Sequence, residues 1–205
     1  MTTLYDYWRS SASYRVRIAL GLADMQWNTE IVDLLNADHR SDTHLTRNPQ
    51  GLVPTLDLDG QMMAQSIAII EYLDETRDLG LLPKSPMEKA KVRALAYAIA
   101  MEIHPICNLN VAKFAVQTSQ GAIENKQWMQ HFITKGLLAY EQLMPNGTYS
   151  YGESVTLADI CLMPQIYNAN RWDVDLGPMP KIRSVVSQLE KLPAFASAHP
   201  DNSPH

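Results

Sequence analysis

The spacing of apolar residues changes near residue 80, and this change limits the folds open to the chain more than any other feature. Before it, short runs rich in β-branched and aromatic residues alternate with helical patterns. After it, apolar residues recur at helical spacing, as at Val92, Leu95, Ala96, Ile99 and Ile103. Strands and helices bury faces of different period. The sequence therefore predicts an α/β region followed by an all-helical region.

The first region predicts four strands and two helices. The strands are expected at residues 3–7, 28–34, 53–58 and 61–63. A helix should follow the first strand, because Val16, Ala19, Leu20 and Ala23 form one stripe, and another should cover residues 66–75. Residues 39–46 read as a short polar helix or loop, and Asp59-Gly60 predicts a type I′ hairpin turn. This order is typical of a thioredoxin-like layout.

The domain boundary is predicted at residues 81–88, where Pro83, Ser85 and Pro86 mark a linker. We expect one domain at 1–80 and a helical domain at 89–205. Within the second domain, a helix is predicted from its periodic residues Phe132, Gly136, Tyr140 and Leu143. A capping box is expected at Thr156 and Asp159, and a last helix at residues 180–192.

The composition limits the kinds of molecule that the chain is expected to bind. The chain has 205 residues, is 46% hydrophobic and carries a net charge of −5. An acidic balance argues against a nucleic-acid partner, and no apolar run reaches the ~20 residues that span a bilayer. Cys107 and Cys161 are expected to be buried reduced thiols. With no signal peptide at the start, the expected location is cytoplasmic.

The segment Arg9-Ser10-Ser11-Ala12-Ser13 is the first candidate site. It joins a strand to a helix N-terminus, where unpaired amides and the helix dipole favour an anion or a thiolate. Serine hydroxyls can bond a sulfur there, and Arg9, Arg15 and Arg17 would add positive charge. The alternative is that Ser10 or Ser13 only caps the helix.

Two further sites lie in the first region. A cis Val53–Pro54 bond would turn the backbone of Val53 outward, to pair with an extended peptide; the alternative is an ordinary edge proline. The amide and hydroxyl of Ser66, next to Gln65, can hold a carboxylate at a helix N-terminus; the alternative is that Ser66 is a plain N-cap.

The fourth candidate is a polar strip in the helical region. His104 and Asn108 are four residues apart, which would put them on one side of a helix, as expected for a cleft wall. A lone histidine can also be structural. No other histidine is spaced to form a metal site with His104, so no metal is expected.

Taken together and in this order, these motifs resemble the glutathione transferase superfamily over nearly the whole chain. The resemblance is specifically to the zeta class, the maleylacetoacetate isomerases, with the glutathione-dependent maleylpyruvate isomerases as a sister family. The stretches that carry it are Trp8-Arg9-Ser10-Ser11, Ser13, residues 15–20, Asn48-Pro49, residues 65–73 and residues 171–176.

The resemblance implies a glutathione transferase fold, a homodimer, glutathione as cofactor and a small maleyl diacid as substrate. Ser10 matches the serine that holds the thiolate of glutathione, and Ser11 matches its neighbour. The other matched binding positions are His39 for the glycine end, Val53 for the cysteinyl backbone, Gln65 and Ser66 for the γ-glutamyl end, and His104, Asn108 and Asn110 in the helical domain. Arg9 and Arg171 match arginines that hold substrate carboxylates.

The chain departs from the patterns of these families at three positions. Ala12 stands where most zeta enzymes have cysteine, and position 104, often Gln in eukaryotic maleylacetoacetate isomerases, is His here as in the maleylpyruvate isomerases. The maleylpyruvate isomerases, however, have arginine where this chain has Asn110. The implied reaction is cis–trans isomerisation of maleylacetoacetate to fumarylacetoacetate in aromatic amino acid breakdown. The alternatives are maleylpyruvate isomerisation in gentisate breakdown, glutathione transfer or dehalogenation of α-halo acids, and a non-catalytic binding module.

Overall fold

The computed structural model describes residues 1–205 and divides the chain into two compact units. The first unit comprises residues 1–80 together with residues 190–205, and the second comprises residues 81–189. The sequence led us to expect residues 89–205 in one helical domain, so the structure differs over the last sixteen residues of that range. No helix has the combination of length and apolar character needed to cross a bilayer.

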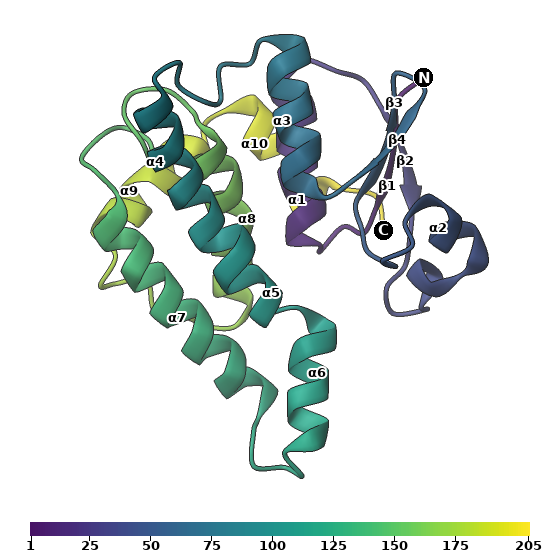
Figure 1. Cartoon of the computed structure of the whole chain (residues 1–205). Helices are drawn as coiled ribbons and strands as arrows, with labels where there is room; N and C mark the ends of the chain where they lie inside the picture. Colours follow the sequence, from purple (N-terminus) through teal and green to yellow (C-terminus); the bar gives the residue numbers. More distant parts are fainter. The chain divides into compact units, whose positions relative to one another are not determined.

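The first unit is a four-stranded sheet with helices (Figure 1). Its elements are β1 (Thr3–Asp6), α1 (Ser11–Leu22), β2 (Asn28–Ile31), η1 (Asp38–Arg40), α2 (Asp42–Arg47), β3 (Thr55–Leu58), β4 (Gln61–Ala64) and α3 (Ser66–Arg77). The sheet order is β2-β1-β3-β4, with β1 parallel to β2 and antiparallel to β3. The predicted thioredoxin-like order is therefore confirmed.

The predicted hairpin turn is also confirmed. Leu58 pairs with Gln61, and the two residues between them have positive φ angles, 54° at Asp59 and 75° at Gly60. A type I′ turn needs φ > 0 at both central positions. The second predicted strand is shorter than expected, because β2 ends at Ile31.

Helices α1 and α3 pack against each other beside the sheet (Figure 1). In α1, the predicted stripe residues Val16, Ala19 and Leu20 are fully buried, and Ala23 is the C-cap rather than a helical residue. This helix also buries Ser13, Tyr14, Arg15 and Arg17. Such a helix is buried on most of its surface, which a single apolar stripe does not predict.

The last residues of the chain form α10 (Pro193–Ser197) and η3 (Pro200–Asn202), and α10 packs on α1. Gly21 makes this approach possible, because a Cβ at that position would lie 3.2 Å from the Cβ of Ala194. Phe195 is fully buried in the same contact region. The helix predicted at residues 180–192 ends earlier than expected, at Leu189, and the short helix α10 follows it.

The second unit is all-helical. It contains α4 (Pro86–Tyr97), the π-helical η2 (Ala98–Ile103), α5 (His104–Ile106), α6 (Leu109–Thr118), α7 (Asn125–Leu143), α8 (Leu157–Arg171) and α9 (Pro180–Leu189). Helix α8 contacts α4, α7 and α9, and every residue from Leu157 to Ile166 is buried. It forms the centre of this unit's core.

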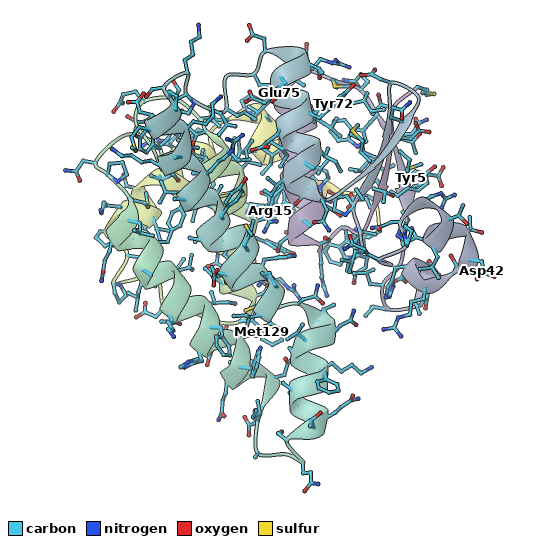
Figure 2. The ribbon with its side chains drawn as sticks, in the orientation of Figure 1. Tyr5, Arg15, Asp42, Tyr72, Glu75 and Met129 are labelled. Carbon is cyan, nitrogen blue, oxygen red and sulfur yellow. The ribbon has the colours of Figure 1, made fainter.

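The capping box predicted at the start of α8 is present. The Asp159 carboxylate accepts hydrogen bonds from the Thr156 amide at 2.8 Å and from the Ser150 amide at 2.8 Å. In α7, Tyr140 is buried as expected, but Leu143 is 60% exposed. The buried face of α7 instead runs through Met129, Ile133 and Leu137 (Figure 2, where Met129 is labelled).

Candidate functional site in the first unit and the residues of the second

Three chain segments meet at one end of the sheet, beyond the ends of its strands. Tyr5 of β1 pairs with Thr55 of β3, and Thr55 pairs with Ala64 of β4. The carboxyl end of β1, the start of β3 and the carboxyl end of β4 therefore lie together. The segments that continue from these ends carry Ser10, Val53 and the Gln65-Ser66 pair.

Ser10 is the N-cap of α1. Its backbone is extended (φ −69°, ψ 119°), and its hydroxyl oxygen accepts a hydrogen bond from the Ser13 amide at 3.2 Å. Its own amide donates to the Tyr7 carbonyl at 2.8 Å. The capping role is therefore real, and it belongs to Ser10, since Ser13 is buried inside the helix.

The cap leaves donors at the start of α1. The amides of Ser11 and Ala12 make no hydrogen bond within the chain, as expected for the first turn of a helix. The Ser10 hydroxyl accepts one hydrogen bond and still has its proton to donate. These three donors and the positive end of a twelve-residue helix favour an anion at this point.

The three nearby arginines do not contribute equally to the local charge. Arg9 is exposed, with its guanidinium 4.1 Å from the centre of the Trp8 ring. Arg17 is buried and forms an ion pair with Asp6 at 2.6 Å. Arg15 is buried beside α3 (Figure 2), and it donates to the Ser66 hydroxyl at 3.2 Å. The expectation that Arg17 adds positive charge to this site is wrong, because Asp6 offsets its charge, and of the three only Arg9 is exposed.

The Val53–Pro54 peptide bond is cis. Strand β3 begins at Thr55, and neither the amide nor the carbonyl of Val53 makes a hydrogen bond within the chain. The preceding carbonyl, that of Leu52, accepts from His44 Nε2 at 3.0 Å and from Asn48 Nδ2 at 2.9 Å. The backbone of Val53 is thus left with one donor and one acceptor for an extended peptide.

Gln65 and Ser66 open α3. The N-cap is Gln65, at φ 69°, and Ser66 is the first helical residue, so the alternative that Ser66 is a plain N-cap is wrong. The Gln65 side chain makes no capping bond and instead donates to Gln50 Oε1 at 2.7 Å. The amides of Ser66, Ile67 and Ala68 therefore remain without partners at this second helix N-terminus.

His39 lies in η1 and is almost fully buried. Its carbonyl oxygen would be 3.1 Å from a Cβ at Gly51, which places it next to the turn that carries Gln50. Burial, with a smaller effect of Arg40, lowers the pKa of His39 below its usual value, so the ring is neutral at pH 7. Its Nδ1 is buried without a hydrogen-bond partner.

The candidates in the second unit lie on three separate elements, α5, α6 and α8. His104 begins α5, which ends at Ile106, and Asn108 has extended backbone (φ −64°, ψ 140°). The helical i, i+4 relation expected for His104 and Asn108 is therefore wrong, because the helix is interrupted between them. Asn108 is the N-cap of α6 and accepts from the Asn110 amide at 3.0 Å. Arg171 is the exposed last residue of α8.

The protein's own thiols are buried. Cys107 and Cys161 are both buried and form no disulfide, as the sequence predicted. Burial raises the pKa of the Cys107 thiol to about 11, so that thiol stays protonated at neutral pH. A reactive thiolate at the start of α1 therefore has to come from a bound molecule.

Sequence reasoning missed the residues that support the site. His44 lies in the polar segment 39–46 and Asn48 in a stretch that carries the family resemblance, yet His44, Asn48 and Gln50 bond the carbonyl before Val53 or the Gln65 side chain. The Asn48-Pro49-Gln50-Gly51 turn was the available signal. Asn side chains bond backbone two residues on in such turns, as Asn48 Oδ1 does with the Gln50 amide at 3.1 Å.

Several known proteins have the same fold and a similar sequence. The family model for the glutathione S-transferase N-terminal domain matches residues 9–76. The chain is 52% identical over 207 residues to the maleylacetoacetate isomerase of Rhizobium meliloti (strain 1021), covering 98% of this chain and 97% of that protein.

Two solved structures show the same fold at high coverage. One is the holo form of a maleyl pyruvate isomerase, a bacterial zeta-class glutathione S-transferase, with a TM-score of 0.94, 40% identity and 98% of each chain covered. The other is the maleylacetoacetate isomerase of Anaeromyxobacter dehalogenans 2CP-1 with glutathione bound in its active site. There the TM-score is 0.89 and the identity 37%, with 100% of this chain and 97% of that chain covered. The chain belongs to the zeta-class glutathione transferases, the family of the maleylacetoacetate isomerases.

Proposed function

We propose that this protein is a glutathione-dependent isomerase that converts maleylacetoacetate to fumarylacetoacetate. The observation that carries the proposal is the start of α1, where the Ser10 hydroxyl and the Ser11 and Ala12 amides are free to donate. Because the chain's own cysteines are buried, these donors suit the sulfur of a bound thiol. Membership of the zeta class supports glutathione as that thiol.

The residues fit glutathione along its length. The unpaired backbone of Val53 suits the cysteinyl residue, as in the addition of a strand to a sheet edge. The α3 N-terminus at Gln65 and Ser66 suits the γ-glutamyl carboxylate. His39 suits the glycine end, and we assign further contacts to His104, Asn108 and Asn110 of the second unit.

Each residue then has a defined task. The Ser10 hydroxyl, the Ser11 and Ala12 amides and the α1 dipole stabilise negative charge on sulfur, which lowers the pKa of a thiol held there. Arg9 and Arg171 are exposed cations that bind the two carboxylates of the substrate and hold its double bond in place. Glutathione, when bound, supplies a thiolate that adds to the cis double bond, allows rotation about it, and is released.

The decisive experiment measures isomerisation of maleylacetoacetate by the purified protein with glutathione, without it, and with S-methylglutathione. The S-methyl form keeps every recognised group except the thiol. We expect turnover only with glutathione. Turnover without a thiol would contradict the proposal.

Maleylpyruvate is the second candidate substrate. It is favoured by the similarity to the maleyl pyruvate isomerase structure and by His104, whereas Asn110 departs from that family. Comparing kcat/KM for the two substrates in one preparation decides between them. Stoichiometric halide release from an α-halo acid would instead support the dehalogenase alternative.

The family resemblance also supports a homodimer that works in the cytoplasm. Light scattering of the purified protein tests the first part, and fractionation of the source cells tests the second. A monomeric mass at assay concentrations would contradict the dimer.

A further inference from the structure

Arg17 uses all three guanidinium nitrogens inside the first unit, and no contact with glutathione or substrate has been assigned to it above. It is 3% exposed. Nη1 pairs with Asp6 Oδ2 at 2.6 Å, Nη2 donates to the Trp8 carbonyl at 3.0 Å, and Nε donates to the Ala198 carbonyl at 3.0 Å. Its partners therefore come from the end of β1, from the turn before α1 and from the segment after α10.

Burying a charge is costly unless it is paired and hydrogen-bonded. Arg17 meets that condition, because Asp6 is 2% exposed and supplies the opposite charge. A planar guanidinium can direct donors to three fixed acceptors at once, whereas the ammonium of lysine is a compact point charge. The geometry is therefore specific to arginine.

The Trp8 carbonyl links this network to Ser10. Trp8 precedes Ser10 by two residues, and the Ser10 amide donates to the carbonyl of Tyr7 at 2.8 Å. The turn from Tyr7 to Ser10 is thus held at two successive carbonyls, one by Ser10 itself and one by Arg17. The indole of Trp8 also contacts the Arg9 guanidinium, which lies 4.1 Å from the ring centre, and stacks on the ring of His205, with the ring centres 4.5 Å apart.

We propose that Arg17 is a positioning residue for the isomerase reaction: by joining the Trp8 carbonyl to Asp6 and to the Ala198 carbonyl, it sets where the Ser10 hydroxyl and the α1 amides point. This inference rests on the proposed function. It predicts that the segment 198–205, distant in sequence, affects chemistry at Ser10 through Arg17 and Trp8.

The test compares Arg17→Lys with Arg77→Lys. Lysine keeps the positive charge at position 17 but cannot serve three segments. Arg77 is a matched control in the same unit, since it pairs with Asp59 at 3.0 Å on the surface and touches no site residue. For Arg17→Lys we expect kcat to fall about tenfold to a hundredfold, the loss that a displacement of about 1 Å produces. Arg77→Lys should keep the wild-type kcat.

A second readout separates positioning from plain stability. The pKa of the bound glutathione thiol, followed by ultraviolet absorbance of the thiolate in the folded protein, should rise in Arg17→Lys and stay unchanged in Arg77→Lys. A folded Arg17→Lys protein with wild-type kcat and wild-type thiol pKa would overturn the proposal, whatever its melting temperature.

Asp6→Asn covers the case in which Arg17→Lys does not fold. It keeps an acceptor oxygen but removes the charge that fixes Arg17, so a smaller rise of the bound-thiol pKa is expected; a wild-type value would overturn the proposal. The titration needs no substrate. If the wild-type protein fails to isomerise maleyl diacids, the proposed function fails while the thiol measurement still tests Arg17.

Discussion

Ser10 combines two roles that can be separated by substitution. Its oxygen caps α1 through the Ser13 amide at 3.2 Å, and its proton is available to a bound sulfur. Replacing an N-cap serine by alanine costs about 1 kcal/mol, whereas glycine at an N-cap costs only a few tenths of that amount. Ser10→Ala and Ser10→Gly remove the same hydroxyl but differ in how much they destabilise the helix.

The two variants should therefore differ in stability and agree in activity. For a chain of this size, a loss of about 1 kcal/mol lowers the melting temperature by about 2–4 °C, so Ser10→Ala should show that shift and Ser10→Gly should stay close to wild type. A hydrogen bond to a charged group contributes about 1.5–3 kcal/mol, which corresponds to a loss of about tenfold to 150-fold in kcat. Both variants should lose activity within that range.

The assay is initial-rate isomerisation at saturating glutathione, well below the melting temperature, with a parallel thermal melt of each variant. Ser10→Thr keeps both the acceptor and the donor and serves as the matched control. If Ser10→Gly retained wild-type activity, or if activity followed stability across the three variants, the hydroxyl would have no chemical role and Ser10 would be only a cap.

Three further predictions concern other parts of the protein. Burial is the main cause that lowers the pKa of His39, so the folding stability that depends on its neutral ring is lost as pH falls through that lowered pKa. The affinity of the protein for S-methylglutathione should nevertheless rise from about pH 8 to about pH 6, because a bound carboxylate favours the protonated ring. Calorimetry should find no such rise in His39→Asn. Gln65→Gly should leave the melting temperature unchanged or raise it, because a backbone φ of 69° strains a residue with a Cβ by about 1–3 kcal/mol. KM for glutathione should rise, and an unchanged KM would mean that Gln65 does not bind glutathione. Glu141→Ala should lower the free energy of unfolding, measured in urea, by about 2–3 kcal/mol, because the Glu141 carboxylate accepts hydrogen bonds from the Lys181 and Ile182 amides at 2.9 Å each. KM for glutathione should not change. A stability loss under about 0.5 kcal/mol would count against this reasoning.

Local signals in the sequence predicted the elements that short-range chemistry decides. Asp59-Gly60 indicated the hairpin because few other residue pairs adopt two positive φ angles. Thr156 and Asp159 indicated the start of α8 because a capping box satisfies its own amides. Ser10, Val53 and the Gln65-Ser66 pair stand out as candidates because each lies beside a strand or helix end, where backbone groups are left without partners.

Features that depend on distant parts of the chain were not predictable in this way. Arg15 and Arg17 read as charges near a binding turn, and only their burial against Ser66 and Asp6 shows that they are internal. The interruption between His104 and Asn108 was not predictable from apolar spacing, because apolar residues stand on both sides of it, at Ile106 and at Val111 and Ala112. Gly21 does not by itself predict that α10 packs on it, because the contact joins residues far apart in the sequence.

The return of residues 190–205 to the first unit has a consequence for how the protein is made. Arg17 meets its acceptor at Ala198 across 181 positions of sequence, and the whole helical unit is encoded between them. On a ribosome the sheet and α1 emerge first, while the carbonyl that completes the buried arginine is still unsynthesised. We therefore expect the nascent first unit to mature only after the helical unit has been translated, so that one of the earliest segments synthesised is among the last to reach its final form.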